Sequence, residues 1–250
     1  MDVSPWKPST LAFTRKCVNL NGGLRCDVGA CGRIRVEGAG MVDELLEWAQ
    51  TLDQIQICNV RRTWAFSLDL GEWEQLRSCF HPNASITVSW YCGPLDGFID
   101  RSKAMVATRK PEEHRKHWLG NMRSEIRGTR AVLETDVLVL IREFIEGSLF
   151  DYTSYARFYD LFEKRAGAWR IAEWNCIYDK DRLDPVAPAG DAVCVQGQAV
   201  LEGAESGFAF MKLRQSKRGR TIPESVVIRD TEGERNLRRR GASWLAGAAV

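Results

Sequence analysis

The sequence predicts an α+β domain, in which a curled antiparallel sheet packs on N-terminal helices and a helical extension follows at the C-terminus. Two observations carry this prediction. Apolar residues recur at helical spacing between residues 41 and 82. Four long strand patterns then follow one another between residues 117 and 178, joined by tight turns, which is typical of an antiparallel meander.

Net charge, cysteine spacing and the length of apolar runs indicate which partners and which compartment to expect. The chain has 250 residues and a formal net charge of +2, so charge alone indicates no nucleic-acid partner. Eight cysteines are scattered without a CxxC pair, which favours reduced thiols in a cytoplasmic protein over a disulfide framework. No apolar run is long enough to span a membrane, and we expect no membrane partner.

The chain divides into three segments by composition. Residues 1–40 mix Gly, Pro, Cys and Arg without a sustained period, and we expect a poorly ordered N-terminal extension. Translation starting at Met41 is one hypothesis for this segment, and mass spectrometry of the native N-terminus would test it. Residues 41–185 hold the predicted domain, and residues 186–250 form a C-terminal extension with short helices.

The centre of the predicted domain is the stretch from Arg61 to Pro82. Trp64 and Leu68 continue an apolar stripe that begins at Ile57, which predicts one buried helix face. Asp69 follows this stripe directly, before a Leu-Gly-Glu turn. A carboxylate at such a bend is either a helix cap or a placed functional group, and local sequence leaves both open.

The remaining elements follow in order. A short helix runs from residue 73 until His81-Pro82-Asn83 ends it. The alternation of residues 86–90 predicts a strand, which Cys92-Gly93-Pro94 breaks, and residues 98–110 predict a helix. The four long predicted strands cover residues 117–126, 131–145, 152–164 and 168–178.

The C-terminal extension is rich in Arg and Lys. Residues 208–213 predict a short helix, and residues 235–247 predict a final one. The positive charges either bind phosphate or form the solvated face of a helix. Aromatic residues for base stacking are not interleaved with the charges, so we expect the solvated face and no nucleic acid.

Three histidines are present, and His117 is the one of interest. His114 and His117 would form a metal site only on a helix, whereas the pattern places His117 at the start of a strand, so we expect no metal. His117, Leu119 and Asn121 would share one face of that strand. If this face lines the inside of the sheet, an imidazole and a carboxamide point into one cavity. The alternative is a buried neutral histidine bonded to structure.

Taken together, these motifs resemble the SnoaL-like branch of the nuclear-transport-factor-2-like superfamily over about residues 45–185. The resemblance rests on the order and spacing of Trp64, Asp69-Leu-Gly-Glu-Trp73, Cys79-Phe-His-Pro82, His117-Trp-Leu-Gly-Asn121, Tyr159-Asp-Leu-Phe-Glu-Lys-Arg-Ala-Gly-Ala-Trp169 and Tyr178-Asp179. It implies a cone-shaped sheet around helices with a deep apolar pocket.

Within that superfamily the pattern resembles hexachlorocyclohexane dehydrochlorinase and, more distantly, scytalone dehydratase. The resemblance implies that Asp69 and His117 form a catalytic dyad for elimination or isomerisation of a small apolar ring compound, with no metal or organic cofactor. The pair that the resemblance selects is also the pair that the residue patterns single out. The expected substrate-binding residues are Trp64, Trp90, Trp118, Asn121, Val139, Tyr155 and Trp174.

Two other functions stay open at this stage. The same cone serves as a non-catalytic ligand-binding or assembly module, and in a polyketide cyclase an acidic residue alone would be the base. Trp64 stands where the family commonly has Tyr, and a second pocket histidine like that of scytalone dehydratase is not evident. The superfamily usually pairs its open sheet faces, so we expect a homo-oligomer, a dimer or trimer.

Overall fold

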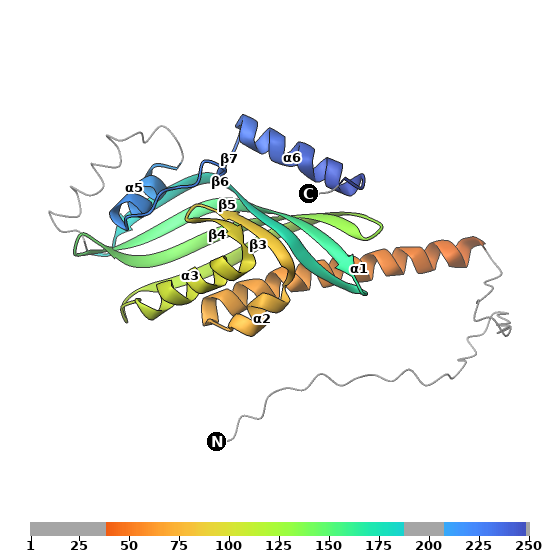
Figure 1. The fold of residues 1–250 in the computed structure, drawn as a ribbon, viewed down its shortest axis with the longest axis horizontal. Coiled ribbons are helices and arrows are strands. Elements are labelled where there is room, and N and C mark those ends of the chain that lie inside the picture. Colours follow the sequence, from red (N-terminus) through yellow and green to blue (C-terminus); the bar gives the residue numbers. More distant parts are fainter. Residues whose placement is uncertain (1–38, 188–207, 249–250) are drawn as a thin grey trace, which may run out of the picture. The chain divides into compact units, whose positions relative to one another are not determined.

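A computed structural model describes residues 39–187 and 208–248 (Figure 1). The chain separates into two compact units, Met1–Ala49 and Gln50–Val250, and the boundary falls within helix α1 (Ala39–Leu70). The predictions for residues 1–38 and for residues 188–207 lie outside the described residues. The described part of the C-terminal extension belongs to the same unit as the sheet.

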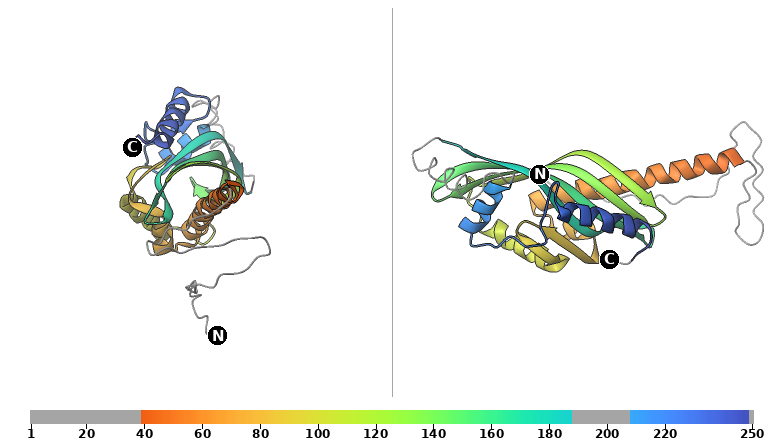
Figure 2. Two further views of the ribbon diagram at one scale, coloured as in Figure 1. Left: turned by 90° about the vertical axis from the view of Figure 1, so that its right-hand side faces the viewer. Right: turned by 90° about the horizontal axis from the view of Figure 1, so that it is seen from above.

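Four further helices are described: α2 (Trp73–Ser78), α3 (Leu95–Ala107), α5 (Ala209–Lys217) and α6 (Glu232–Leu245). The strands are β1 (Phe80–Val88), β2 (Tyr91–Pro94), β3 (His114–Arg127), β4 (Arg130–Ile145), β5 (Ser148–Arg165), β6 (Ala168–Pro185) and β7 (Val227–Ile228). They form one sheet in the order β2-β1-β6-β5-β4-β3, with β7 beside β6. The fold class is therefore the predicted one: α+β with a curled sheet, which arches over the part of α1 that belongs to the second unit (Figure 2).

The four long strands were predicted because each is a long run rich in apolar residues and tight turns separate them. From β3 to β6 the pairing is antiparallel, as expected for a meander, whereas β1 and β7 pair with β6 in parallel. The predicted break at residues 92–94 is wrong, because these residues form β2 against β1. The short helix also ends earlier than predicted, and Pro82 lies in β1 at a shift of register, where no ladder hydrogen bond is needed from it.

Only one part of the apolar stripe of α1 is buried. Ile57, Trp64 and Leu68 are buried, as their spacing predicts. Leu52 and Ile55, which precede Ile57 in the stripe, are exposed, and so are Leu45, Leu46 and Trp48 within the first unit. Helical spacing predicted the helix correctly, but it did not predict which part of the stripe is buried.

An aromatic layer fills the space between α1 and the inside of the sheet. The ring of Trp64 meets those of Trp174 and Phe158 edge-on, with centroids 4.6 and 5.1 Å apart. The Arg61 guanidinium lies in the same layer, 4.5 Å from the Trp64 ring, and it pairs with Asp160 on β5. Both charged side chains are fully buried, so each depends on the other for its charge to be satisfied.

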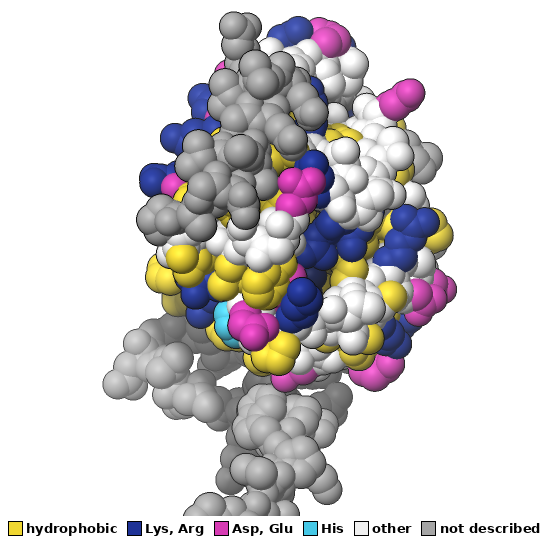
Figure 3. Space-filling model, turned by 90° about the vertical axis from the view of Figure 1, so that its left-hand side faces the viewer, with side chains coloured by type: hydrophobic (Ala, Val, Ile, Leu, Met, Phe, Trp, Pro, Cys, Tyr) yellow, Lys and Arg dark blue, Asp and Glu magenta, His cyan; other side chains and the backbone are white. Residues whose placement is uncertain are grey.

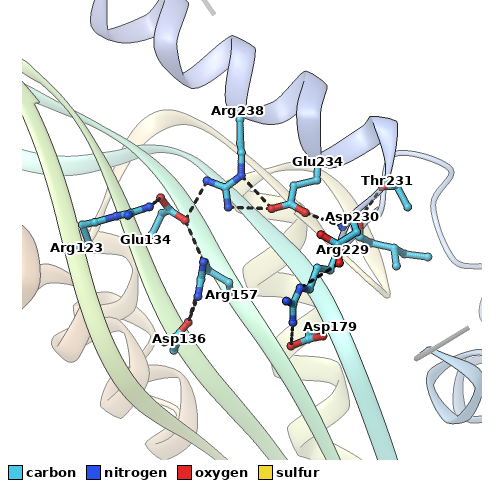
Figure 4. A network of polar contacts seen from close by, with 11 residues as sticks. Arg123, Glu134, Asp136, Arg157, Asp179, Arg229, Asp230, Thr231, Glu234 and Arg238 are labelled. Carbon is cyan, nitrogen blue, oxygen red and sulfur yellow. Dashed lines mark hydrogen bonds and ion pairs between the residues drawn. The ribbon is translucent and has the colours of Figure 1, made fainter.

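The two C-terminal helices pack on different parts of the sheet. The Met211 N–H at the start of α5 donates to the Asp181 carboxylate on β6 at 2.6 Å. Helix α6 lies on the sheet face opposite α1 to α3 (Figure 1). There Glu134 on β4 receives Arg238 of α6 at 3.1 Å and Arg157 of β5 at 3.5 Å, in the polar network of Figure 4.

None of the described helices is long and apolar enough to span a membrane.

Candidate active site

Asp69 and His117 meet where the end of α1 reaches the start of β3. The Asp69 Oδ1 atom lies 2.7 Å from His117 Nδ1, and Oδ2 accepts the backbone N–H of His117 at 2.8 Å. Both carboxylate oxygens are thus directed at one residue. The cap of α2 falls at Glu72, without a side-chain hydrogen bond. Asp69 is therefore not the cap of α2, and its carboxylate is bonded to His117 instead.

The surroundings hold this pair as a carboxylate and a neutral imidazole. Burial lowers the pKa of His117 below its ordinary value, and this outweighs the opposing effect of Asp69. Burial alone would raise the pKa of Asp69, but the hydrogen bonds from His117 and the charge of Arg115 hold it below its ordinary value. With Asp69 ionised, the proton on the imidazole belongs on Nδ1, which leaves Nε2 free to accept a proton.

Arg115 is the third member of this cluster. Its Nη2 donates to the Leu68 carbonyl oxygen at 3.0 Å, and its Nε lies 3.7 Å from Asp69 Oδ1. Burial lowers the pKa of Arg115 to about 10. The arginine therefore joins the last turn of α1 to β3 and stabilises the Asp69 carboxylate. On β3, Arg115 and His117 are two residues apart and share a face, a signal that was present in the sequence.

His117 lines a cavity of about 90 Å³ between the helices and the inside of the sheet. Apolar and aromatic side chains form most of its wall, including Trp90, Phe98, Val139 and Trp174. Its volume is small beside the several hundred Å³ of a typical ligand site, so binding of a ring compound requires wall side chains to move. Met105 and Met211 both line the cavity and are flexible enough to do so.

Four of the seven expected substrate-binding residues lie at or next to this cavity. Trp90, Val139 and Trp174 line it together with His117. Trp64 is fully buried behind the imidazole, with the two rings edge-on at 5.0 Å, so it supports His117 and does not face the cavity.

The other three expected residues lie outside this cavity, although Trp118 borders a separate groove beside α1 together with His117. Trp118 follows His117 directly on β3, so its side chain points the other way and is 60% exposed. Asn121 was expected to share the face of His117, but an extra residue in β3 between Leu119 and Met122 shifts the register, and Asn121 is exposed. The Tyr155 ring lies against Lys180, with the ammonium 4.7 Å from its centroid.

The structure adds cavity residues that sequence reasoning missed. Tyr152 of β5 lines the cavity, as do Arg214 and Gln215 of α5 and Arg220, which follows α5. The basic tail was interpreted as a solvated face, and for these residues that interpretation is wrong. The local sequence around Arg214, Gln215 and Arg220 carries no signal for this role, because these residues reach the cavity only through the packing of α5 on β6.

Among the described residues, no group of three or more His, Cys, Asp or Glu side chains is placed to hold a metal ion. His114 is exposed, in line with the expectation that it does not converge with His117.

Comparison with known proteins points to one family. A model of the SnoaL-like domain matches residues 49–175, which confirms the resemblance seen in the sequence. A PEP2-like protein of Fusarium vanettenii is 32% identical over 216 residues, which cover 80% of this chain and 88% of that protein. Pea pathogenicity protein 2 of the same fungus is 32% identical over 140 residues, 55% of this chain and 59% of that protein.

Among solved structures, hexachlorocyclohexane dehydrochlorinase type 3 from Novosphingobium barchaimii aligns with a TM-score of 0.46 and 20% identity. The alignment covers 57% of this chain and 96% of that one.

Proposed function

This chain belongs to the SnoaL-like domain family, and on that premise we propose that it is a small-molecule lyase or isomerase that works through the Asp69–His117 pair. The reaction is an elimination, such as loss of water or of hydrogen halide, or a shift of a double bond. The substrate is an apolar ring compound, which suits the aromatic wall of the cavity. The single observation that carries the proposal is the 2.7 Å contact between Asp69 Oδ1 and His117 Nδ1 beside that cavity.

The proposed chemistry follows from the protonation state of the pair. His117 Nε2 takes a proton from a ring carbon, and the electrons of that C–H bond form the new double bond. The leaving group departs from the neighbouring carbon with its bonding pair, as halide, or as water once the imidazolium has protonated it. In an isomerisation the imidazolium returns the proton to another carbon. Asp69 keeps the proton of Nδ1 in place and stabilises the imidazolium.

The test is a screen of halogenated, hydroxylated and polyketide ring compounds for elimination. Release of halide, or absorbance of the new double bond, reports turnover. We expect turnover of at least one class by the wild-type protein and its loss in His117→Ala. His81→Gln is the matched control, since His81 does not line the cavity and bonds to the Glu163 carbonyl oxygen instead, and it should stay active.

Two outcomes would contradict the proposal. Turnover that survives His117→Ala would exclude the imidazole as the base. Binding of the ring compounds without turnover of any would favour the ligand-binding module.

We also propose that the protein forms a homo-oligomer and works in the cytoplasm. A groove of about 570 Å³ runs along α1 and the edge strand β3, and the exposed side chains of Phe66 and Trp118 line it. An uncovered apolar edge of this kind supports self-association. The described cysteines are all free, which suits a reducing compartment. Light scattering of the wild type and of Trp118→Ser tests the first point: a smaller particle for the variant is expected, and a monomeric wild type would contradict it.

A further inference from the structure

The cavity beside His117 continues into a recess that is rich in arginine. Met105, Arg115, Ile141, Arg214 and Arg220 line both spaces. The recess also has Arg109, Arg142 and Arg218 in its wall, against two carboxylates, Glu113 and Glu143. Figure 3 shows Lys and Arg side chains gathered in the middle of the end of the molecule where α5 lies, between hydrophobic side chains. Positive charge thus stands at the entrance to an apolar cavity.

Most of these arginines already have a carboxylate partner. Arg142 pairs with Asp151 at 2.6 Å. Arg214 and Arg218 share Glu143, with contacts of 3.0 and 2.7 Å. Arg218 also lies 3.4 Å from Glu113, so each of the two recess carboxylates already has an arginine partner.

Arg220 is the exception that borders both spaces. Its guanidinium makes no ion pair or hydrogen bond with any residue that the structure describes. Burial and the neighbouring charges of Arg218 and Arg214 lower the pKa of Arg220, and the attraction of Glu143 offsets this only in part. A half-buried guanidinium at a cavity wall, without a direct carboxylate partner, is a site for an anion.

Four other buried polar atoms in the cavity wall lack a hydrogen-bond partner within the described chain. They are Nε of Arg115, the hydroxyl of Tyr152, Nε1 of Trp174 and Oε1 of Gln215. Buried polar atoms in folded proteins are nearly always hydrogen-bonded, so donors left over at a cavity wall indicate groups that a ligand satisfies. Three of the four can donate, which again suits an oxygen-rich anionic group.

The segment that carries Arg220 is held firmly. The Arg220 N–H donates to the Gln215 carbonyl oxygen at 2.8 Å, which closes the chain after α5. The start of α5 is fixed by the bond from Met211 to Asp181, and the Arg214 guanidinium lies 4.1 Å from the centroid of the Tyr152 ring. The C-terminal extension therefore supplies a fixed part of the cavity wall.

We infer that Arg220, with Arg115, forms an anion subsite of the cavity, and that the substrate is a ring compound bearing a carboxylate. This inference rests on the proposed function for the reaction, and it adds the class of substrate. The carboxylate lies against the arginines at the recess, and the ring lies in the apolar part beside His117.

Calorimetric titration of the full chain with benzoate and with methyl benzoate tests the subsite without any need for turnover. These two probes share a ring and differ in charge. We expect benzoate to bind wild-type protein about tenfold more tightly than the ester. Arg220→Gln should abolish this preference, while Arg220→Lys should keep most of it because the positive charge remains.

Arg229→Gln is the matched control, since Arg229 also belongs to the C-terminal extension but pairs with Asp179 away from the cavity. It should leave the benzoate affinity unchanged, and a thermal melt of each variant checks folding. Equal affinity for acid and ester, no benzoate binding, or a preference that survives Arg220→Gln would overturn the subsite. Binding of benzoate tests the subsite and turnover in the screen tests the base, so a failed subsite and a failed base give different results.

Discussion

The carboxylate of Asp69 holds His117 at two points, through the ring nitrogen Nδ1 at 2.7 Å and through the backbone N–H at 2.8 Å. One carboxylate thereby fixes both the position of the strand and the orientation of the imidazole. The end of α1 and the start of β3, 48 residues apart in the chain, are joined at the point where the proposed base stands.

The first prediction concerns Asp69→Asn. The amide keeps the shape of the side chain but can donate to Nδ1, which favours the tautomer with the proton on Nε2. We expect kcat to fall by about 10²- to 10⁴-fold, with little change in substrate affinity. Steady-state kinetics on any substrate found in the screen measures both. A variant that kept its kcat would show that the carboxylate does not set the tautomer.

The second prediction is the pH dependence of kcat/KM. The base must be neutral, and burial holds the pKa of His117 below its ordinary value of 6.5. Activity should therefore rise with pH on an acidic limb whose midpoint lies below 6.5, and it should be level at neutral pH. A midpoint above 6.5 would mean that the imidazole is charged at rest.

The lowered pKa of His117 also makes the free energy of unfolding depend on pH. Because the unfolded chain takes up a proton on this histidine at higher pH than the folded one, the stability linked to His117 is complete above pH 6.5. It is lost as pH falls from there toward the folded pKa. The slope of unfolding free energy against pH in this range should be smaller in His117→Gln.

The third prediction concerns the buried pair of Arg61 and Asp160. Both side chains are fully buried, so Arg61→Met leaves a carboxylate without a partner and should cost about 3–5 kcal/mol of unfolding free energy. The double variant Arg61→Met with Asp160→Leu removes both charges and should recover most of the loss. Urea denaturation measures the unfolding free energy of the wild type, of Arg61→Met and of the double variant. A loss in the double variant as large as that in Arg61→Met would contradict the prediction.

The fourth prediction tests the packing of α6. A Cβ built on Gly241 would lie 2.0 Å from the Tyr159 hydroxyl oxygen, so the helix approaches β5 too closely for alanine. We expect Gly241→Ala to destabilise the protein by about 1–3 kcal/mol. Gly233→Ala in the first turn of the same helix meets its nearest atom at 3.4 Å and is the matched control, which should be neutral or stabilising. If Gly241→Ala left the free energy of unfolding unchanged, α6 would have to lie farther from the sheet than the structure shows.

Regular patterns explain what the sequence could predict. The long strands are runs rich in apolar and β-branched residues that tight turns separate, so their positions and antiparallel pairing followed from local residues. Asp69 and His117 were identifiable because each stands at the boundary of a strongly patterned element. Asn121 was misplaced because one extra residue in β3 reverses the face, and an irregularity of one residue leaves no periodic signal.

The arginines of the C-terminal extension were beyond local prediction for a different reason. Arg214 and Arg220 meet the cavity about a hundred residues away from His117 in the chain, through the packing of α5 on β6. In the sequence, the basic segment that holds them cannot be distinguished from the solvated face of a helix. Only the tertiary structure shows that their charges stand at the entrance to an apolar cavity.

The most direct test of the central claim is ¹⁵N NMR of the histidine side chains in the ligand-free protein. The chain has three histidines, so His117→Gln suffices to assign the signal of His117. At pH 7 we predict a neutral imidazole protonated on Nδ1, with Nε2 free and a pKa below 6.5, and in Asp69→Asn a change toward the other tautomer. A His117 that is charged at pH 7, or that carries its proton on Nε2 in the wild type, would contradict its assignment as the general base.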